Sequence, residues 1–146
     1  MSITDTLITN WLNIDIIFEP KITNIQTDFR NGYYFGQLLL KLGLISEDDS
    51  NLYIISNKLN EIRENFFLLQ KNLNDILGLK LRNEEIEDFI NNYNKYNIVL
   101  LLYRIKSSYY KHKIHLSDIK ISSAYISPQE LSQKLDLFID YKNNNA

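Results

Sequence analysis

The sequence predicts an all-α fold, a compact bundle of about four main helices with shorter helices between them. Only four glycines and two prolines interrupt 146 residues, which favours long uninterrupted elements. Apolar residues recur at helical spacing in several stretches, above all in residues 28–44, DFRNGYYFGQLLLKLGL. No part of the chain has the pattern of a β-α-β unit. A single domain built from helices packed on helices follows from this length and these patterns.

The composition limits the classes of protein that the chain can represent. It contains no cysteine, which excludes disulfide scaffolds, cysteine zinc sites and cysteine nucleophiles. The net charge of −2 gives no global attraction to nucleic acid or to a membrane. The sequence shows no signal peptide, no glycosylation sequon and no apolar run near ~18 residues. We therefore expect a soluble cytoplasmic protein of a reducing compartment.

The first helix is expected to begin at Thr4 or Asp5, since either side chain can cap a helix N-terminus. Trp11, the only tryptophan, falls on the apolar face of this helix and is predicted to anchor the core. The buried stripe comprises Leu7, Ile8, Trp11 and Leu12. Residues 14–21 are expected to be irregular and to end near Pro20, which cannot lie inside a helix.

The stretch 28–44 is expected to contain a short helical turn, a sharp turn and then a core helix. Ile22, Ile25 and Phe29 predict the short turn, and Asn31-Gly32 marks the sharp one. The inward face of the core helix comprises Phe35, Leu38, Leu39 and Leu42. Gly36 within it would allow a neighbouring element to approach closely, and Gly43 is expected to end it.

Residues 46–51, SEDDSN, are predicted to form an exposed loop, because they lack the glycine and the twelfth-position glutamate of a calcium-binding loop. Asn57 is expected to cap the following helix, which Gly78 ends. The apolar stripe of that helix comprises Leu59, Ile62, Phe66, Leu69, Leu73 and Leu77.

Two further helices are expected before residue 113. One starts at residues 83–85, and its early acidic residues suit capping and solvation. Its inward residues are Ile86, Phe89, Ile90 and Tyr93. Residues 98–103, IVLLLY, are apolar on every side and predict a helix buried all round, with a central β-strand as the alternative.

The C-terminal part is expected to hold one more helix. Ser127-Pro128-Gln129-Glu130 has proline at the first helical position and a Ser…Glu capping box. The apolar face of this helix comprises Leu131, Leu135 and Phe138. Residues 143–146 have the composition of a polar linker, as expected if the chain is part of a longer protein.

The sequence contains no catalytic constellation. His112 and His115 could share a helix face, but no acid accompanies them, and Lys111 and Lys113 disfavour a cation there. The acids of residues 84–88 crowd one face, whereas an acid/base pair requires separate environments. Phosphate-loop, nucleophile-elbow and dinucleotide motifs are absent from the sequence. We expect no enzyme, no cofactor, no metal and no small-molecule substrate.

A basic and aromatic segment is the charged feature that favours a partner. It combines Tyr109 and Tyr110 with basic residues, and its one acid is Asp118. The basic residues are Arg104, Lys106, Lys111, His112, Lys113 and Lys120. Such a patch could steer association with an acidic surface. The alternative is that these cations only complement the C-terminal end of a helix. Nucleic acid would use the same patch, but the acidic total disfavours it.

The order of these pieces resembles the calponin homology (CH) domain. The matching residues are Trp11-Leu12, Asp28-Phe29, Asn31-Gly32, Leu38-Leu39 and Gly43-Leu44. Residues 29–44 are most similar in pattern to the CH-like domain at the N-terminus of sperm flagellar protein 2 and related axonemal proteins. Residues 58–60, Phe66, Leu69, Leu77-Gly78-Leu79 and Leu101-Leu102-Tyr103 extend the resemblance, which covers residues 3–113. Asn31 and Gln37 depart from the acidic residues usual at those two positions, and a glycine usual near the start of the last family helix is absent.

The resemblance implies a division into a CH-like domain at residues 3–113, a helical extension at 114–142 and the start of a polar linker at 143–146. The implied fold-defining core comprises Trp11, Phe29, Gly32, Leu38, Leu39, Phe66, Leu69, Leu101 and Leu102.

The implied function is non-catalytic binding to the cytoskeleton. For this subclass the resemblance implies microtubules or tubulin as the partner, in the axoneme of a cilium or flagellum. The candidate contact residues are Arg104, Lys106, Lys111, Lys113 and Lys120. The alternative is a scaffold domain that binds another axonemal protein. Actin filaments are disfavoured, because tandem pairs of CH domains bind actin and this chain has room for one.

Overall fold

The computed structural model of the chain describes residues 3–91 and 95–120, with side chains at residues 3–91 and 96–113. Every regular element in those two ranges is a helix, which confirms the all-α prediction. The elements in chain order are α1 (Ile3–Asn10), the π-helical turn η1 (Trp11–Asp15), α2 (Ile25–Asp28), α3 (Tyr33–Lys41), α4 (Glu47–Ser50), α5 (Leu59–Leu77), α6 (Asn83–Asn91) and α7 (Lys95–Lys120). The strand considered for residues 98–103 is therefore wrong, because those residues lie within α7.

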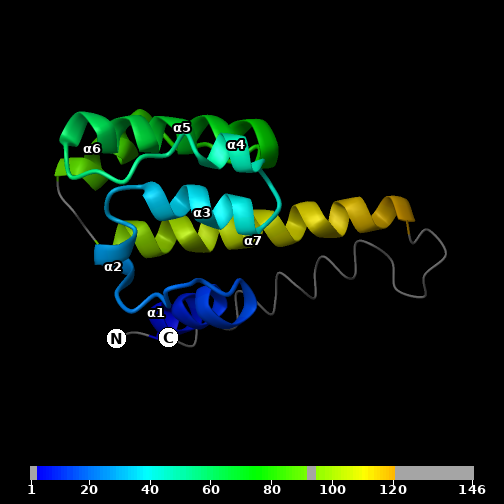
Figure 1. Cartoon of the computed structure of the whole chain (residues 1–146). Helices are drawn as coiled ribbons and strands as arrows, with labels where there is room; N and C mark the ends of the chain where they lie inside the picture. Colours follow the sequence, from blue (N-terminus) through cyan, green and yellow to red (C-terminus); the bar gives the residue numbers. More distant parts are fainter. Residues whose placement is uncertain (1–2, 92–94, 121–146) are drawn as a thin grey trace.

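The helices enclose α3 (Figure 1). In this view α5 and α6 lie above α3, while α7 and α1 lie below it. Helix α7 contacts α1, α2 and α5, so it crosses most of the bundle. The described part of α7 then continues past the ends of α1, α3 and α5 (Figure 1).

Two glycines of the sequence determine how helix α3 packs and where it ends. A side chain at Gly36 would place its Cβ 2.5 Å from the Tyr53 ring, so only glycine fits against that ring. Gly43 has a φ of +73°, and its N–H donates to Leu40. The N–H of Leu44 reaches back to Leu39, which completes a Schellman motif. Both glycine predictions are confirmed.

The side chains assigned to the core are buried. Trp11 is 2% exposed, and the other predicted core side chains are at most 1% exposed. These are Phe29, Leu38, Leu39, Phe66, Leu69, Leu101 and Leu102. Gly32 adopts a φ of +80°, and a Cβ there would meet Asn65 Cβ at 3.0 Å. Glycine is needed at this turn for both reasons.

A buried amide joins three segments of the bundle. Asn65, on α5, is 0% exposed, yet its side chain makes three hydrogen bonds. Its Nδ2 donates to the carbonyl of Asn31 at 2.9 Å and to that of Ile54 at 2.7 Å. Its Oδ1 accepts from the N–H of Ile54 at 2.8 Å. The turn before α3 and the segment before α5 are thereby fixed to the middle of α5.

Helix α1 begins earlier than predicted from its expected cap residues. Thr4 and Asp5 lie inside α1 and are not its caps, because the helix already starts at Ile3. The predicted irregular stretch 14–21 starts within η1. The side chain of Asn13 then exchanges two hydrogen bonds of 2.8 Å with the backbone of Ile22. This clamp leads into α2, the short helix predicted around Ile22, Ile25 and Phe29.

Helix α4 replaces an expected loop. Residues 47–50 are helical because Ser46 caps them, its Oγ accepting from the N–H of Asp49. Ser50, predicted to be exposed, is 1% exposed. The acids of the segment suit the positive end of the helix.

Three predictions for the long helices are wrong. Asn57 does not cap α5, since Lys58 holds the N-cap position and makes no side-chain cap bond. Leu59 is 56% exposed because it lies at the first position of α5, outside the core. Leu100 is 40% exposed, so α7 is not buried all round at residues 98–103.

The remaining predictions concern residues both inside and outside the described ranges. Ile86 and Phe89 are buried on α6, and Ile90 is half-buried. Three predictions lie outside the described residues: the inward position of Tyr93, the helix expected to start at Ser127, and the linker at 143–146. Helix α7 runs without a break across residues 113 and 114. Within the described ranges, no helix is long and apolar enough to span a bilayer.

Asn65→Ala is expected to destabilise the protein by about 3 kcal/mol, because three backbone groups lose a buried partner. Urea unfolding followed by circular dichroism measures the free energy of unfolding. The control is Asn74→Ala on the same helix, whose side chain is exposed and whose replacement should cost less than about 0.5 kcal/mol. Equal stability of the two variants would contradict a structural role for the Asn65 amide.

Candidate functional site

Helix α7 has a buried half and a projecting half. Its 26 residues correspond to about 39 Å. Among the described side chains of α7, which end at Lys113, the last buried one is Ile105. Lys111 and Lys113 are exposed, and His112 is half-buried. Of the basic residues that the sequence singled out, Lys111 and Lys113 therefore lie beyond the last buried side chain described on α7, whereas Arg104 and Lys106 contact the bundle.

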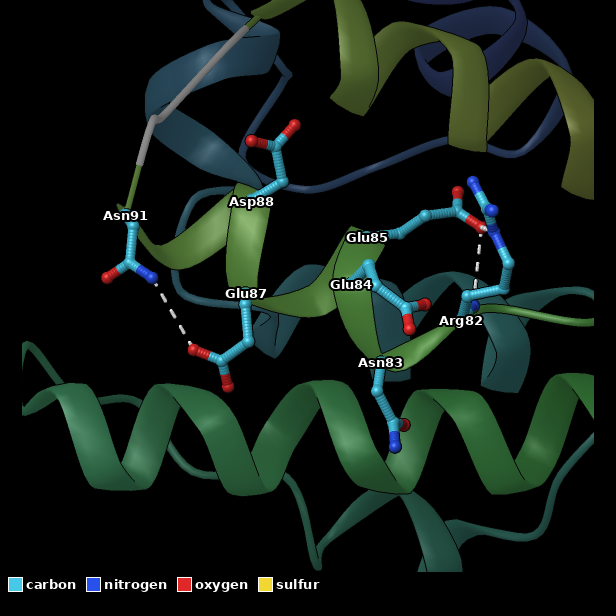
Figure 2. Close-up of a pocket in the computed structure, with 7 residues that line it drawn as sticks. All are labelled: Arg82, Asn83, Glu84, Glu85, Glu87, Asp88 and Asn91. Atoms are coloured by element: carbon cyan, nitrogen blue, oxygen red, sulfur yellow. Dashed lines mark hydrogen bonds and ion pairs between the residues drawn. The ribbon is translucent and has the colours of Figure 1, made fainter.

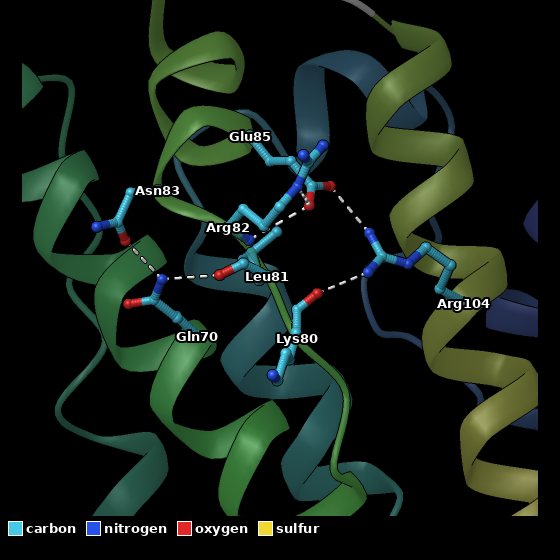
Figure 3. A network of polar contacts seen from close by, with 7 residues as sticks. All are labelled: Gln70, Lys80, Leu81, Arg82, Asn83, Glu85 and Arg104. Carbon is cyan, nitrogen blue, oxygen red and sulfur yellow. Dashed lines mark hydrogen bonds and ion pairs between the residues drawn. The ribbon is translucent and has the colours of Figure 1, made fainter.

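Arg104 serves the fold rather than the surface. Its Nη1 lies 2.9 Å from Glu85 Oε2, and its Nη2 donates to the carbonyl of Lys80 at 2.6 Å. Arg82 reaches the same carboxylate from its Nε and its backbone N–H, both at 3.2 Å. Lys80 and Leu81 belong to the connection between α5 and α6. Gln70, on α5, donates to the carbonyl of Leu81 at 2.7 Å and so fixes this connection to α5 (Figure 3). We call the contact of Arg104 with Glu85 and Lys80 the Arg104 latch.

Arg82 and the Arg104 latch together keep Glu85 ionised. Burial raises the pKa of this carboxyl, but hydrogen bonds from Arg82 and the charge and hydrogen bond of Arg104 outweigh burial. The net result is a pKa below the usual range. Glu85 therefore stays ionised and keeps α7 attached to the start of α6.

Two further acids of α6, Glu87 and Asp88, pair with side chains of α5 and α7. The sequence analysis assigned the early acids of this helix to capping and solvation and did not predict these pairs. Glu87 forms a two-point pair with Arg63 of α5, at 2.8 and 3.0 Å. The hydrogen bond from Arg63 lowers the pKa of Glu87, and the hydrogen bond with Glu87 raises the pKa of Arg63. Both side chains are therefore kept in their charged forms. Asp88 accepts a hydrogen bond of 2.7 Å from Asn97 of α7.

A shallow hollow lies around α6, but its side chains do not converge. Figure 2 shows them pointing outward in several directions from the helix. The lining residues are Arg82, Asn83, Glu84, Glu85, Glu87, Asp88 and Asn91. Within residues 3–91 and 95–113, no three histidine, aspartate or glutamate side chains come close enough to hold a metal ion.

Aromatic rings hold two of the candidate lysines. Lys106 Nζ lies 5.6 Å from the Trp11 ring centroid, and Lys113 Nζ lies 5.4 Å from that of Tyr109. Trp11 Nε1 also donates to the hydroxyl of Tyr110 at 3.2 Å. Tyr109 and Tyr110 meet edge to face at 5.2 Å. Trp11 thus contacts both Lys106 and Tyr110 and fixes the beginning of the basic segment against the core.

The candidate lysines divide between two sides of α7. Successive residues turn by about 100° around a helix, so Lys106, Tyr110 and Lys113 share one side and Tyr109 borders them. Lys111 lies on the other side. We call Lys106, Tyr109, Tyr110 and Lys113 the basic-aromatic stripe. Their spacing is visible in the sequence, but the contact with Trp11 spans 99 residues and has no local signal. Lys120 follows in register at the end of α7, with its side chain outside the description.

Two further hollows flank the turn between α2 and α3. Both are lined by Thr27 and Asn31. One also reaches Leu59 and the other Ile55, which are 56% and 72% exposed. Leu52 and Ile54 are exposed on the same connection between α4 and α5. This apolar segment is a second surface that the sequence analysis missed, because its four apolar residues within eight positions are visible in the sequence but their exposure is not.

Comparison with known proteins gives one match. The model of a family described as the CH-like domain in sperm protein matches residues 8–107. The match runs from α1 through the buried half of α7 and stops before Lys111 and Lys113. No curated protein and no solved structure matches the chain.

Glu85→Gln is expected to destabilise the protein at pH 7 and to lose that effect in acid. A carboxyl whose folded pKa is lowered adds stability above its unfolded pKa, and this contribution disappears as the pH falls through the folded pKa. Urea unfolding at pH 7 and near pH 3 should therefore show a difference between wild type and variant that shrinks in acid. The control is Glu84→Gln, at an exposed position of the same helix. A difference between wild type and Glu85→Gln that does not depend on pH would contradict the conclusion that Arg82 and Arg104 together hold Glu85 ionised.

Proposed function

Since the chain belongs to the family of CH-like domains in sperm protein, cytoskeleton-associated binding modules, we propose that it is a non-catalytic domain that binds microtubules. We place this activity in the axoneme of a cilium or flagellum. The observation that carries the proposal is the projecting end of α7 with Lys111 and Lys113 exposed.

Electrostatics supports this assignment of the binding surface. Between residues 104 and 113 the chain carries four lysine or arginine residues and no acid. One of them, Arg104, belongs to the Arg104 latch, so the proposed contacts are Lys106, Lys111 and Lys113. Microtubules present an acidic surface, which attracts such a patch and raises the association rate at low salt.

A scaffold domain for another axonemal protein is the second candidate function. The exposed apolar segment between α4 and α5 favours it, because exposed apolar patches mark protein contacts. Its side chains are Leu52, Ile54, Ile55 and Leu59. The apolar face predicted for Leu131, Leu135 and Phe138 lies outside the described residues.

Lys111→Glu/Lys113→Glu is expected to lower co-sedimentation with microtubules about tenfold, because two attractive charges become repulsive. The matched control is Lys71→Glu/Lys80→Glu, at two exposed positions away from the projecting end of α7. Each substitution changes the charge by −2, so both variants go from −2 to −6. Raising the ionic strength from about 0.01 M to 0.1 M should weaken wild-type binding, because the screening length falls from about 30 to 10 Å. Equal loss in the two double variants would contradict the proposed surface, and pelleting with actin filaments alone would contradict the proposed partner.

Ile55→Asp is expected to leave microtubule binding unchanged if the main proposal is correct. The scaffold function instead requires binding to isolated axonemes, no binding to microtubules assembled from purified tubulin, and loss of axoneme binding in Ile55→Asp. Sedimentation of both variants with both kinds of filament separates the two functions. Ile55 is 72% exposed, so this substitution should cost little stability.

A further inference from the structure

We infer that the exposed apolar segment between α4 and α5 binds a basic amphipathic helix of a partner protein. The segment comprises Leu52, Ile54, Ile55 and Leu59. It lies apart from the proposed microtubule contacts, because the connection runs along α5 on one side of α3 while α7 lies on the other side (Figure 1). The inference does not need microtubule binding, and it names the chemistry that the second candidate function leaves open.

The fold holds the apolar side chains of this segment at the surface. Tyr53, between Leu52 and Ile54, is 3% exposed. Its ring packs against Gly36, and its hydroxyl accepts a hydrogen bond of 2.9 Å from Asn72. The two neighbours of this inward anchor are left 57% and 40% exposed. An apolar surface that is ordered in advance loses little entropy when a partner binds.

Acidic side chains adjoin the apolar segment and determine the charge of its partner. Glu47, Asp48 and Asp49 are exposed, and within the described residues none of these carboxylates forms a salt bridge. The N–H of Leu52 donates to the carbonyl of Asp49 at 3.2 Å, so the first apolar side chain directly follows the acids. Residues 46–57 contain these three acids and no lysine or arginine, which gives a local charge of −3. A basic peptide complements this charge, whereas an acidic protein or an anionic membrane is repelled.

A helix fits this surface better than an added β-strand. Ile54 uses both of its backbone groups on the Asn65 side chain, at 2.8 and 2.7 Å, so they are not available to pair with an extended peptide. Leu52 and Leu59 are seven residues apart, so the segment is at most about 25 Å long. An amphipathic helix of about four turns covers this length and presents apolar side chains at every third or fourth position.

The two hollows beside the segment provide room for side chains of the bound helix. Ile55 borders the hollow that Tyr33 and Tyr34 also line, and Leu59 borders the hollow that Phe89 also lines. The exposed apolar side chains thus stand next to recesses with partly aromatic walls. Recesses of this composition receive the large apolar anchors of a partner.

The test is fluorescence anisotropy with a labelled helical peptide of about 16 residues, built from leucine and lysine with all leucines on one face. Ile55→Ser is expected to weaken peptide binding about tenfold, because the isoleucine is 72% exposed in the free protein and would lose contact with water in the complex. The matched control is Ile14→Ser on η1, where the isoleucine is 68% exposed. This control should change binding less than about twofold.

The charge of the surface is tested with a second pair of variants. Glu47→Gln/Asp48→Asn is expected to weaken binding about fivefold at low salt, and this difference should shrink as salt is added. The control Asp15→Asn/Glu84→Gln removes two acids at exposed positions of η1 and α6. Both double variants change the net charge by +2, from −2 to 0, so only the position of the acids differs.

The outcomes distinguish this inference from the proposed function. Weakening by Ile55→Ser and by Glu47→Gln/Asp48→Asn, but not by their controls, supports the inference whether or not the domain pellets with microtubules. Equal effects of variants and controls overturn it, as does equal binding of a peptide of the same composition with its leucines scattered around the helix. Self-association of the chain that Ile55→Ser abolishes, without peptide binding, overturns it in favour of a second copy. Failure to pellet with microtubules overturns only the proposed function.

Discussion

The buried side chain of Asn65 is the constraint on which the arrangement of the bundle depends. An amide at 0% exposure is unfavourable unless its polar atoms are paired, and here the partners come from two other segments. Asn31 presents its carbonyl to this amide at a turn where Gly32 has a positive φ and no room for a Cβ. Ile54 presents both of its backbone groups. Apolar contacts alone would allow these segments to slide along α5, but directional hydrogen bonds fix their register.

Local periodicity explains how much of this fold the sequence predicts. Burial along α3 and α5 repeats with the helical period, so the core positions and the role of Gly36 follow from spacing alone. Polar contacts between elements have no such signal, because Arg104 and Glu85 are nineteen residues apart and only the fold brings them together. Asn65 is an intermediate case. It lies three residues after Ile62 and four before Leu69, so an amide on an apolar face was visible, although its partners were not.

The candidate site depends on the division of α7 into a part that packs in the bundle and a part that projects from it. The first half of the helix is fixed by its buried residues and by the Arg104 latch. Trp11 then serves two roles, since its ring lies in the core while its Nε1 and ring face contact Tyr110 and Lys106. The sequence predicted the basic segment, but it could not separate Arg104, which stabilises the fold, from the lysines that remain at the surface. Nor could it show that Lys106 and Lys113 are held by rings.

The distribution of charge explains how a chain with a net charge of −2 can present an attractive surface to an acidic partner. Three acids of α6 are engaged by neighbouring side chains: Glu85, Glu87 and Asp88. Glu85 meets α7 at Arg104, and Lys113 lies nine residues further along, which corresponds to about 13 Å of helix. The screening length at 0.1 M salt is about 10 Å, so the paired acids of α6 contribute little to the potential at Lys113. The potential near Lys113 therefore depends little on the paired acids of α6, and the net charge of the whole chain does not exclude the acidic partner that we propose.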